Sequence, residues 1–215
     1  MKKLDITIIC SSKKHPIYPH LKNWIQKNSN HYNVRLVNKA LDIKKGDILF
    51  LISCTELISL KIRNKFKHTL VIHESDLPKG KGWSPLIWQI LNGANEIMIT
   101  LLEAEDKVDS GDIWKQRKIK VEPYEVIDEI NTKLFPIKLK LLEYAIKHHN
   151  TIKPKTQRKE NATYYKRRTP KDSKLDVNQT LSQQFDLLRV ADNIRYPCFF
   201  DYRGHRYKLI LRKSY

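Results

Sequence analysis

The sequence has 215 residues, 40% of them hydrophobic and 30% charged, which excludes a disordered chain and favours a folded protein with a sizeable core. Its three cysteines lack the CxxC spacing of zinc and redox sites, and no stretch approaches the roughly 20 apolar residues of a membrane span. We therefore expect a protein of the reducing cytoplasm, with no metal site and no membrane partner.

The formal net charge of +18 is the extreme value of the composition. A positive surface attracts phosphates of any kind, whether they belong to nucleic acid or to a small anionic substrate. Lysines are spread along the whole chain, and the one dense basic run, at residues 153–174, is interpreted as a solvated connector. This distribution disfavours nucleic acid as the main ligand.

The first half of the chain alternates strand patterns with helix patterns. Strands are predicted where apolar and β-branched residues gather, at residues 4–9, 33–38, 47–52 and 68–73. Helices are predicted at residues 19–28 and 55–64, the second with Thr55 as its cap. Residues 47–52 form an uninterrupted apolar run, which is typical of a parallel strand covered on both faces.

The second half continues the alternation. Ser84 and Pro85 predict the start of a helix that Gly93 ends. The remaining predictions are strands at 96–104 and 113–121, a long helix from Pro123 towards His149 that kinks at Pro136, a helix at 180–191, and a pair of strands around 198–202 and 206–211.

This order of elements predicts an α/β fold, a Rossmann-like, doubly wound and mostly parallel sheet with a small C-terminal helix plus β-hairpin extension. We expect a catalytic domain over residues 1–152, with the basic connector and extension of residues 153–215 packed on it. The turn after the first strand reads SSKKH, without the GxGxxG of a dinucleotide site, so NAD binding is disfavoured.

Residues 73 to 109 concentrate what an active site needs. His73 ends a predicted strand, a glycine-rich loop follows it, and Asp109 lies in an acidic loop after a later strand. An imidazole can accept a proton near neutral pH, and a carboxylate beside it favours the charged form. From the residues alone, a loop histidine and a solvated acidic turn remain an equal alternative.

The stretch HESDLPKGKGWSPLIWQILNGANEIMITLLEAEDKVDSGDIW resembles the core of the folate-dependent formyltransferases, as found in methionyl-tRNA formyltransferase. Their pattern is a histidine, SxLPxxxGxxP, a helix ending in NG, and an acidic DxG turn. Here the matching residues are His73, Ser75, Leu77, Pro78, Gly82, Pro85, Asn92, Gly93, Asp109 and Gly111. Downstream, RRTPKDSKLD and FDLLRVADNIRYPCFF resemble the stretch that follows the core in formyltransferases acting on tRNA or on sugars.

The resemblance implies the formyltransferase fold, His73 and Asp109 as the catalytic residues, and 10-formyltetrahydrofolate as co-substrate without a metal. By the same resemblance, the cofactor pocket is expected at Cys54, Thr55, Glu56, Leu57, Glu103, Glu105, Lys107 and Val108, with a helix cap and a surface loop as the equal alternative. Candidates for substrate binding are Ser75, Lys79, Lys81, Gly82, Trp83, Phe199 and Tyr202, of which the lysines, Trp83 and the aromatic residues have ordinary structural roles as the alternative.

The segment HESDLPKGKGWSP is most similar to the corresponding segment of the nucleotide-sugar N-formyltransferases of pseudaminic-acid type pathways. This implies that the acceptor is the 4-amino group of a UDP-linked 4-amino-4,6-dideoxy sugar. The oligomeric state is left open. One residue departs from the pattern, since the family places an asparagine two positions before the histidine and this chain has Val71. A valine cannot donate a hydrogen bond to the formyl oxygen, so Ser75 or a backbone amide is expected to replace it.

Other functions stay open at this stage. The amine could belong to a tRNA-bound or peptidyl acceptor, although the sequence shows no separate tRNA-gripping domain after the core. A water in place of the amine would make the protein a formyl-folate hydrolase. The charge and Val71 together also allow a non-catalytic basic module that binds nucleic acid.

Overall fold

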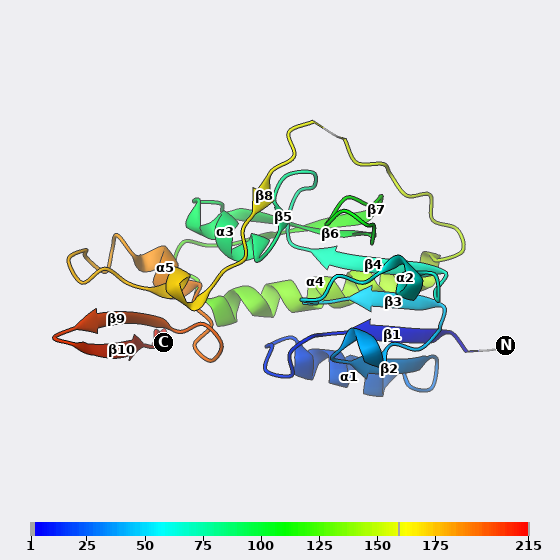
Figure 1. Cartoon of the computed structure of the whole chain (residues 1–215), viewed down its shortest axis with the longest axis horizontal. Helices are drawn as coiled ribbons and strands as arrows, with labels where there is room; N and C mark the ends of the chain where they lie inside the picture. Colours follow the sequence, from blue (N-terminus) through cyan, green and yellow to red (C-terminus); the bar gives the residue numbers. More distant parts are fainter. Residues whose placement is uncertain (1–2, 159, 215) are drawn as a thin grey trace.

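A six-stranded sheet runs through the protein in the order β2-β1-β3-β4-β6-β7 (Figure 1). The computed structural model describes residues 3–158 and 160–214. The strands are β1 (Asp5–Ile9), β2 (Asn33–Val37), β3 (Ile48–Leu51), β4 (His68–His73), β6 (Glu96–Glu103) and β7 (Ile113–Lys120). Strands β1 to β4 are parallel, and β6 and β7 are antiparallel additions at the β4 edge. The predicted doubly wound, mostly parallel α/β sheet is confirmed.

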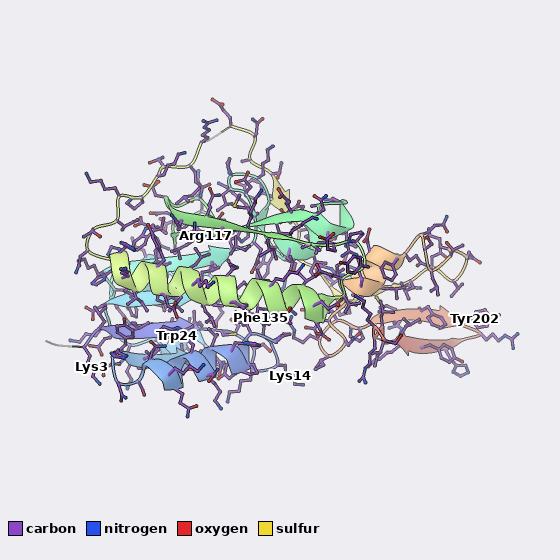
Figure 2. All side chains as sticks on the ribbon, turned by 180° about the vertical axis from the view of Figure 1, so that it is seen from behind. Lys3, Lys14, Trp24, Arg117, Phe135 and Tyr202 are labelled. Atoms are coloured by element: carbon purple, nitrogen blue, oxygen red, sulfur yellow. The ribbon has the colours of Figure 1, made fainter. Side chains whose placement is uncertain are left out.

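The larger core lies between the sheet and two helices, α1 (Tyr18–Asn28) and α4 (Ile127–His148). Figure 2 shows both helices on this face, with Trp24 on α1 and Phe135 on α4 labelled. The two helices are also joined directly, because the Trp24 indole N–H donates to a Glu143 carboxylate oxygen at 3.0 Å. Helix α4 therefore crosses the sheet and brings its N-terminal half to the carboxyl ends of the parallel strands.

A smaller apolar cluster covers the opposite face of the sheet. It packs Leu49, Leu51 and Phe66 under two short elements, η1 (Ala40–Asp42) and α2 (Leu60–Arg63). Helix α3 (Pro85–Leu91) follows the loop after β4 and contributes Leu86 and Ile90 to the larger core. Both faces of the central strands are therefore buried, as the uninterrupted apolar pattern of β3 predicts.

The C-terminal part contains β8 (Tyr164–Tyr165), η2 (Pro170–Ser173), α5 (Phe185–Arg189), β9 (Cys198–Tyr202) and β10 (His205–Leu209). Strands β9 and β10 form the expected hairpin, which extends from one end of the molecule (Figure 1). The C-terminal part has a small apolar core of its own. It is also attached to the rest of the protein, because Val190 packs in the larger core and Arg189 donates hydrogen bonds to the carbonyls of Glu122 and Glu125. The boundary at residue 152 stays a prediction.

The basic run at residues 153–174 is not the solvated connector that its charge suggests. Strand β8 pairs in parallel with β5 (Lys81–Gly82), inside the loop that follows β4. The Gln157 amide donates to the carbonyls of Asp109 and Gly111, at 3.0 and 2.6 Å. Lys159, in the same run, lies outside the described residues. We call residues 153–158 and 160–168 the strap, because these residues contact both loops of the predicted site.

Several helix starts differ from the predictions. Thr55 does not cap a helix, because its backbone N–H donates to the Ser11 hydroxyl at 2.9 Å, and α2 begins only at Leu60. Helix α4 begins at Ile127, where Glu129 accepts a hydrogen bond from the Val126 N–H at 3.0 Å, and it continues through Pro136. The predicted helix at 180–191 is shortened to α5. Within the described residues, no helix has the length and apolar composition that crossing a bilayer requires.

Candidate active site

His73 ends β4 with its side chain buried, 6% of the residue being exposed. Its Nε2 lies 2.8 Å from the Gly80 carbonyl oxygen. Because a carbonyl only accepts hydrogen bonds, Nε2 carries the ring proton in the neutral histidine. The unprotonated Nδ1 lies 3.6 Å from Asp109 Oδ2. The imidazole therefore offers a lone pair next to a carboxylate, the arrangement expected of a general base.

Asp109 occupies the turn between β6 and β7 with a left-handed backbone, φ 51°. Its Oδ2 accepts a hydrogen bond from the Gly82 N–H at 2.8 Å. Two residues later, a Cβ on Gly111 would lie 2.1 Å from the Glu103 carbonyl oxygen, so only glycine fits there. The DxG spacing thus brings the turn back against β6 and directs the carboxylate towards His73.

The loop after β4 approaches the strap just as closely. Gly82 has φ +95°, and a Cβ there would lie 2.5 Å from the Tyr165 carbonyl oxygen. Glycine at this position allows β5 and β8 to pair. The strap consequently holds the Gly82 N–H in place, and this N–H in turn orients the Asp109 carboxylate.

A cavity of about 460 Å³ opens at the carboxyl end of β4. Successive side chains of a strand point to opposite faces of a sheet, so Val71 and His73 face one way and Ile72 the other. Val71 packs with the cluster that contains Leu51 and Ile58, whereas Ile72 packs with the core under α4. The cavity is lined from both faces and therefore has two halves that meet at the end of β4.

The first half, which we call the loop half, combines apolar side chains with polar and acidic residues of the surrounding loops. Its lining residues include Leu51, Ser53, Cys54, Thr55, Glu56, Leu57, Ile58, Val71, Ala104, Glu105, Val108 and Asp109. Leu57 is 81% exposed beside it. Burial raises the pKa of the Cys54 thiol, so this group stays neutral at physiological pH. Such a surface suits a flat, largely uncharged ring system.

The second half, which we call the α4 half, is lined by an apolar face of α4 with charged groups at its deep end. Ile127, Leu134 and Phe135 supply the apolar wall. At the deep end Lys138 forms an ion pair with Glu74, the residue after His73. Burial opposes ionisation of Glu74 most strongly, but the charges of Lys138 and His73 together with hydrogen bonds to the carboxylate outweigh it and lower the pKa of that carboxyl below its ordinary value.

His15 also lines the α4 half, just beyond β1. Its Nδ1 accepts a hydrogen bond from the Ile17 N–H at 3.2 Å, which leaves the ring proton on Nε2. Burial, together with the positive charges of Arg195 and Lys138, lowers the pKa of His15 to about 2. His15 is therefore neutral over the physiological range.

The rim of the α4 half is cationic and aromatic. The Arg167 guanidinium lies over the Trp83 ring, 4.7 Å from its centroid. Arg168 is 9% exposed, and its Nε has no hydrogen-bond partner among the described residues. Arg195 is fixed by Asp192 at 2.6 Å and lies over the Tyr196 ring. This rim combines groups that bind phosphates with groups that stack on rings.

A family model described as formyl transferase matches residues 8–146, the part of the chain that builds the sheet, His73 and Asp109. This chain belongs to the formyl transferase family. The activity that the family indicates is formyl transfer, which agrees with the resemblance seen in the sequence. The fold predicted from the sequence therefore agrees with the family that this model identifies.

Solved structures with the same fold include methionyl-tRNA formyltransferase from Clostridium thermocellum, with a TM-score of 0.85 and 22% identity over 99% of this chain and 94% of that chain. A 4-N formyltransferase from Francisella tularensis has a TM-score of 0.72 and 19% identity over 99% and 98%. HypX from Aquifex aeolicus in complex with tetrahydrofolic acid has a TM-score of 0.78 and 16% identity, with 98% of this chain matching 38% of that one. At these identities the likeness is one of fold.

The structure separates the predicted cofactor residues of this formyl transferase into two groups. Cys54, Thr55, Glu56, Leu57, Glu105 and Val108 line the loop half of the cavity. Glu103 and Lys107 do not line it. A Glu103 carboxylate oxygen instead accepts a hydrogen bond from the Trp114 indole N–H at 3.1 Å, and Lys107 is exposed.

Of the predicted substrate residues, Gly82 and Trp83 line the cavity, and Ser75, Lys79, Lys81, Phe199 and Tyr202 do not. Ser75 is buried behind the loop, Phe199 lies under Arg206 in the C-terminal hairpin, and Tyr202 is half-exposed near the tip of that hairpin. Within the described residues, no group of three or more His, Cys, Asp or Glu side chains is placed so that it could hold a metal ion.

Sequence reasoning missed Glu74, Lys138, His15 and the arginines of the rim as cavity residues. Lys138 is one of many lysines, and only the helical register of α4 places it opposite the end of β4. The sequence did hold a partial signal for this wall, because one face of the helix carries all five of its cavity residues, at the spacing of successive turns: Ile127, Asn131, Leu134, Phe135 and Lys138. The basic run carried no such signal, since its pairing with β5 joins segments far apart in sequence.

Proposed function

We propose that this protein moves the formyl group of 10-formyltetrahydrofolate to the 4-amino group of a UDP-linked 4-amino-4,6-dideoxy sugar, as in pseudaminic-acid type surface glycans. The observation that carries the proposal is one cavity that is lined from both faces of the sheet and has His73 in its lining. A transferase for two substrates needs such a meeting point, because it must hold both reacting groups in contact.

The loop half fits the folate. Its apolar walls, among them Leu51, Ile58 and Val71, suit the faces of a pterin ring, and the loop of residues 53–58 offers backbone groups for the ring edge. The complex of HypX with tetrahydrofolic acid, which has the same fold, supports this choice. Folate bound there supplies the formyl carbon, already activated on a nitrogen.

The α4 half fits an anionic acceptor that carries an amine. Arg167 and Arg195 at the rim suit a diphosphate, and Trp83 and Tyr196 offer ring faces to a nucleotide base. The apolar wall of α4 suits the deoxygenated side of a dideoxy sugar. A sugar N-formyltransferase from Shewanella sp FDAARGOS_354, which has the same fold and matches this chain over nearly its whole length, supports this acceptor class.

In the proposed mechanism, the neutral acceptor nitrogen forms a bond to the formyl carbon, and the bond from that carbon to the folate nitrogen breaks. His73 Nδ1 takes the proton that the acceptor nitrogen loses and returns it to the leaving nitrogen, so protons balance. The Gly80 carbonyl fixes the tautomer that leaves Nδ1 free, and Asp109 stabilises the imidazolium while Gly82 holds the carboxylate.

Val71 changes how the formyl oxygen is stabilised. It lines the loop half and donates no hydrogen bond, and Ser75 lies outside the cavity. We propose that protonated His73, the cationic donor at the point where the two halves meet, stabilises the negative charge that develops on this oxygen. The protein thus uses one side chain for two purposes that an asparagine and a histidine would otherwise share.

The acceptor is tested by mass spectrometry of UDP-4-amino-4,6-dideoxy sugars after incubation with the protein and 10-formyltetrahydrofolate. We expect the gain of one formyl group on the sugar. Loss of formyl groups from folate without a formylated sugar would contradict this acceptor, and formate as the product would identify a hydrolase. Salt-sensitive binding to random nucleic acid without any folate binding would support the non-catalytic alternative instead.

A further inference from the structure

The ion pair of Glu74 and Lys138 lies in the wall of the cavity, next to His73. The Glu74 and Lys138 side chains are 16% and 3% exposed. An ammonium has three N–H donors, yet Glu74 is the one hydrogen-bond or ion-pair partner of Lys138 among the described residues. Lys138 therefore keeps donors for a ligand, and the exposed part of Glu74 keeps acceptor capacity at the same spot.

The pair is a poor device for stability alone. Burying two charges costs about as much as their attraction returns, and apolar residues of similar volume often stabilise a fold as well or better. Elsewhere the same core is apolar on both sides, with Leu134 and Phe135 on the preceding turn of α4. A charged pair at this one place, with His73 adjacent in sequence, therefore points to recognition of a ligand.

His15 completes the polar end of the α4 half. Its Nδ1 is used by the Ile17 N–H, so Nε2 carries a proton and has no partner among the described residues. The deep end thus presents one carboxylate acceptor, the Glu74 group, and two sets of donors, from Lys138 and His15. A ligand that matches them has an N–H donor beside oxygen acceptors.

We propose that Glu74 and Lys138 form the subsite that recognises the acceptor amine, in which the Glu74 carboxylate accepts an amine N–H and Lys138 donates to a neighbouring oxygen of the same sugar. This inference rests on the proposed function and names the residues that select the reactive nitrogen. The subsite orients that nitrogen at the end of β4, where His73 receives its proton. A hydroxyl in place of the amine has one donor hydrogen instead of two and is bound less tightly.

The test uses titration calorimetry with two probes, a UDP-4-amino-4,6-dideoxy sugar and the UDP-6-deoxy sugar with a 4-hydroxyl. We expect the wild-type protein to bind the amino sugar about ten-fold more tightly than the hydroxy sugar. Glu74→Gln should lose most of this preference and keep its affinity for tetrahydrofolate, which reports an intact loop half. Glu96→Gln, in the exposed ion pair with Lys118, is the matched control and should keep the preference.

The reversed pair, Glu74→Lys with Lys138→Glu, separates recognition from structure. If the pair serves packing alone, the reversed pair restores both stability and preference for the amine, and this result would overturn the inference. Recognition predicts that the preference stays lost. Should the reversed pair fail to fold, Glu74→Gln decides, and an unchanged preference in it overturns the subsite. A wild-type protein that binds neither nucleotide sugar contradicts the proposed acceptor itself, and with it the subsite.

Discussion

The chemistry of the site depends on which nitrogen of His73 is free. Gly80 accepts from Nε2 and leaves Nδ1 facing Asp109, while the carboxylate is held by the Gly82 N–H. The sequence indicates His73 and Asp109 as the candidate catalytic pair but does not show which group fixes the tautomer of the imidazole. In the structure a backbone carbonyl has that role, and it could not be predicted because it depends on the path of the loop.

Replacing His73 or Asp109, the two residues proposed to be catalytic, should lower turnover without unfolding the protein. We expect His73→Ala to reduce the turnover number by roughly 10² or more, because the proton acceptor is lost. Asp109→Asn keeps an acceptor for the Gly82 N–H but removes the charge beside His73, and a similar loss is expected. Steady-state rates and thermal melts of both variants provide the test, and wild-type rates in both would refute the assignment.

Val71 offers a gain of function. Val71→Asn places an amide donor in the loop half, where the family pattern has one, and relieves His73 of stabilising the formyl oxygen. One such donor is worth about 10²-fold in turnover in acyl transfer, so we expect an increase of about ten-fold or more. Single-turnover formylation rates measure it. An unchanged rate in a folded variant would show that the site already stabilises the oxygen fully.

His15 predicts how stability depends on pH. Its pKa falls from an ordinary value near 6.5 to about 2 on folding, so below pH 6.5 the unfolded chain binds a proton that the folded protein does not. The free energy of unfolding should therefore decrease from pH 7 to pH 5 by up to about 2 kcal/mol through this group. Urea unfolding of His15→Gln should show a correspondingly shallower decrease, and identical pH slopes would contradict a buried neutral His15.

At the scale of elements, the parts that follow local patterns were predictable and the parts that follow contacts between distant segments were not. The apolar run of β3 predicted a buried parallel strand, and the DxG and glycine-rich loops predicted close turns. The strap was misread because its basic residues look solvated, whereas its backbone pairs with β5. The helix expected at Thr55 was wrong because Ser11, more than forty residues earlier, binds that backbone.

The turn between β6 and β7 should be intolerant of a side chain. Gly111→Ala forces a Cβ against the Glu103 carbonyl oxygen, so the turn must shift and move Asp109 away from Gly82. We expect turnover to fall by about 10²-fold, since a misplaced group costs nearly as much as a missing one. Gly93→Ala is the control, because it has φ +83° and open space around it, and it should lose about 1 kcal/mol of stability and keep its turnover. Equal turnover in the two variants would contradict the role of the turn.

At the scale of the whole molecule, the sheet, α4 and the C-terminal extension act together. The sheet brings His73 and Asp109 to one edge, α4 supplies the wall with Lys138, and the chain after the strap contributes Arg195 and Tyr196. The net charge of +18 fits the proposed acceptor, since a positive field raises the local concentration of an anion. The sequence predicted the sheet and contains the positive charge, but only the folded structure shows which lysine and arginine side chains line the cavity.

The central claim is that formyl transfer to an amine occurs at the end of β4, with His73 as the proton acceptor. The most direct measurement is the rate of tetrahydrofolate formation from 10-formyltetrahydrofolate, with and without a UDP-4-amino-4,6-dideoxy sugar, in the wild-type protein and in His73→Ala. The account predicts a rate that depends on the sugar and falls by roughly 10² or more in the variant. A rate that is independent of the sugar, or unchanged in His73→Ala, would contradict it.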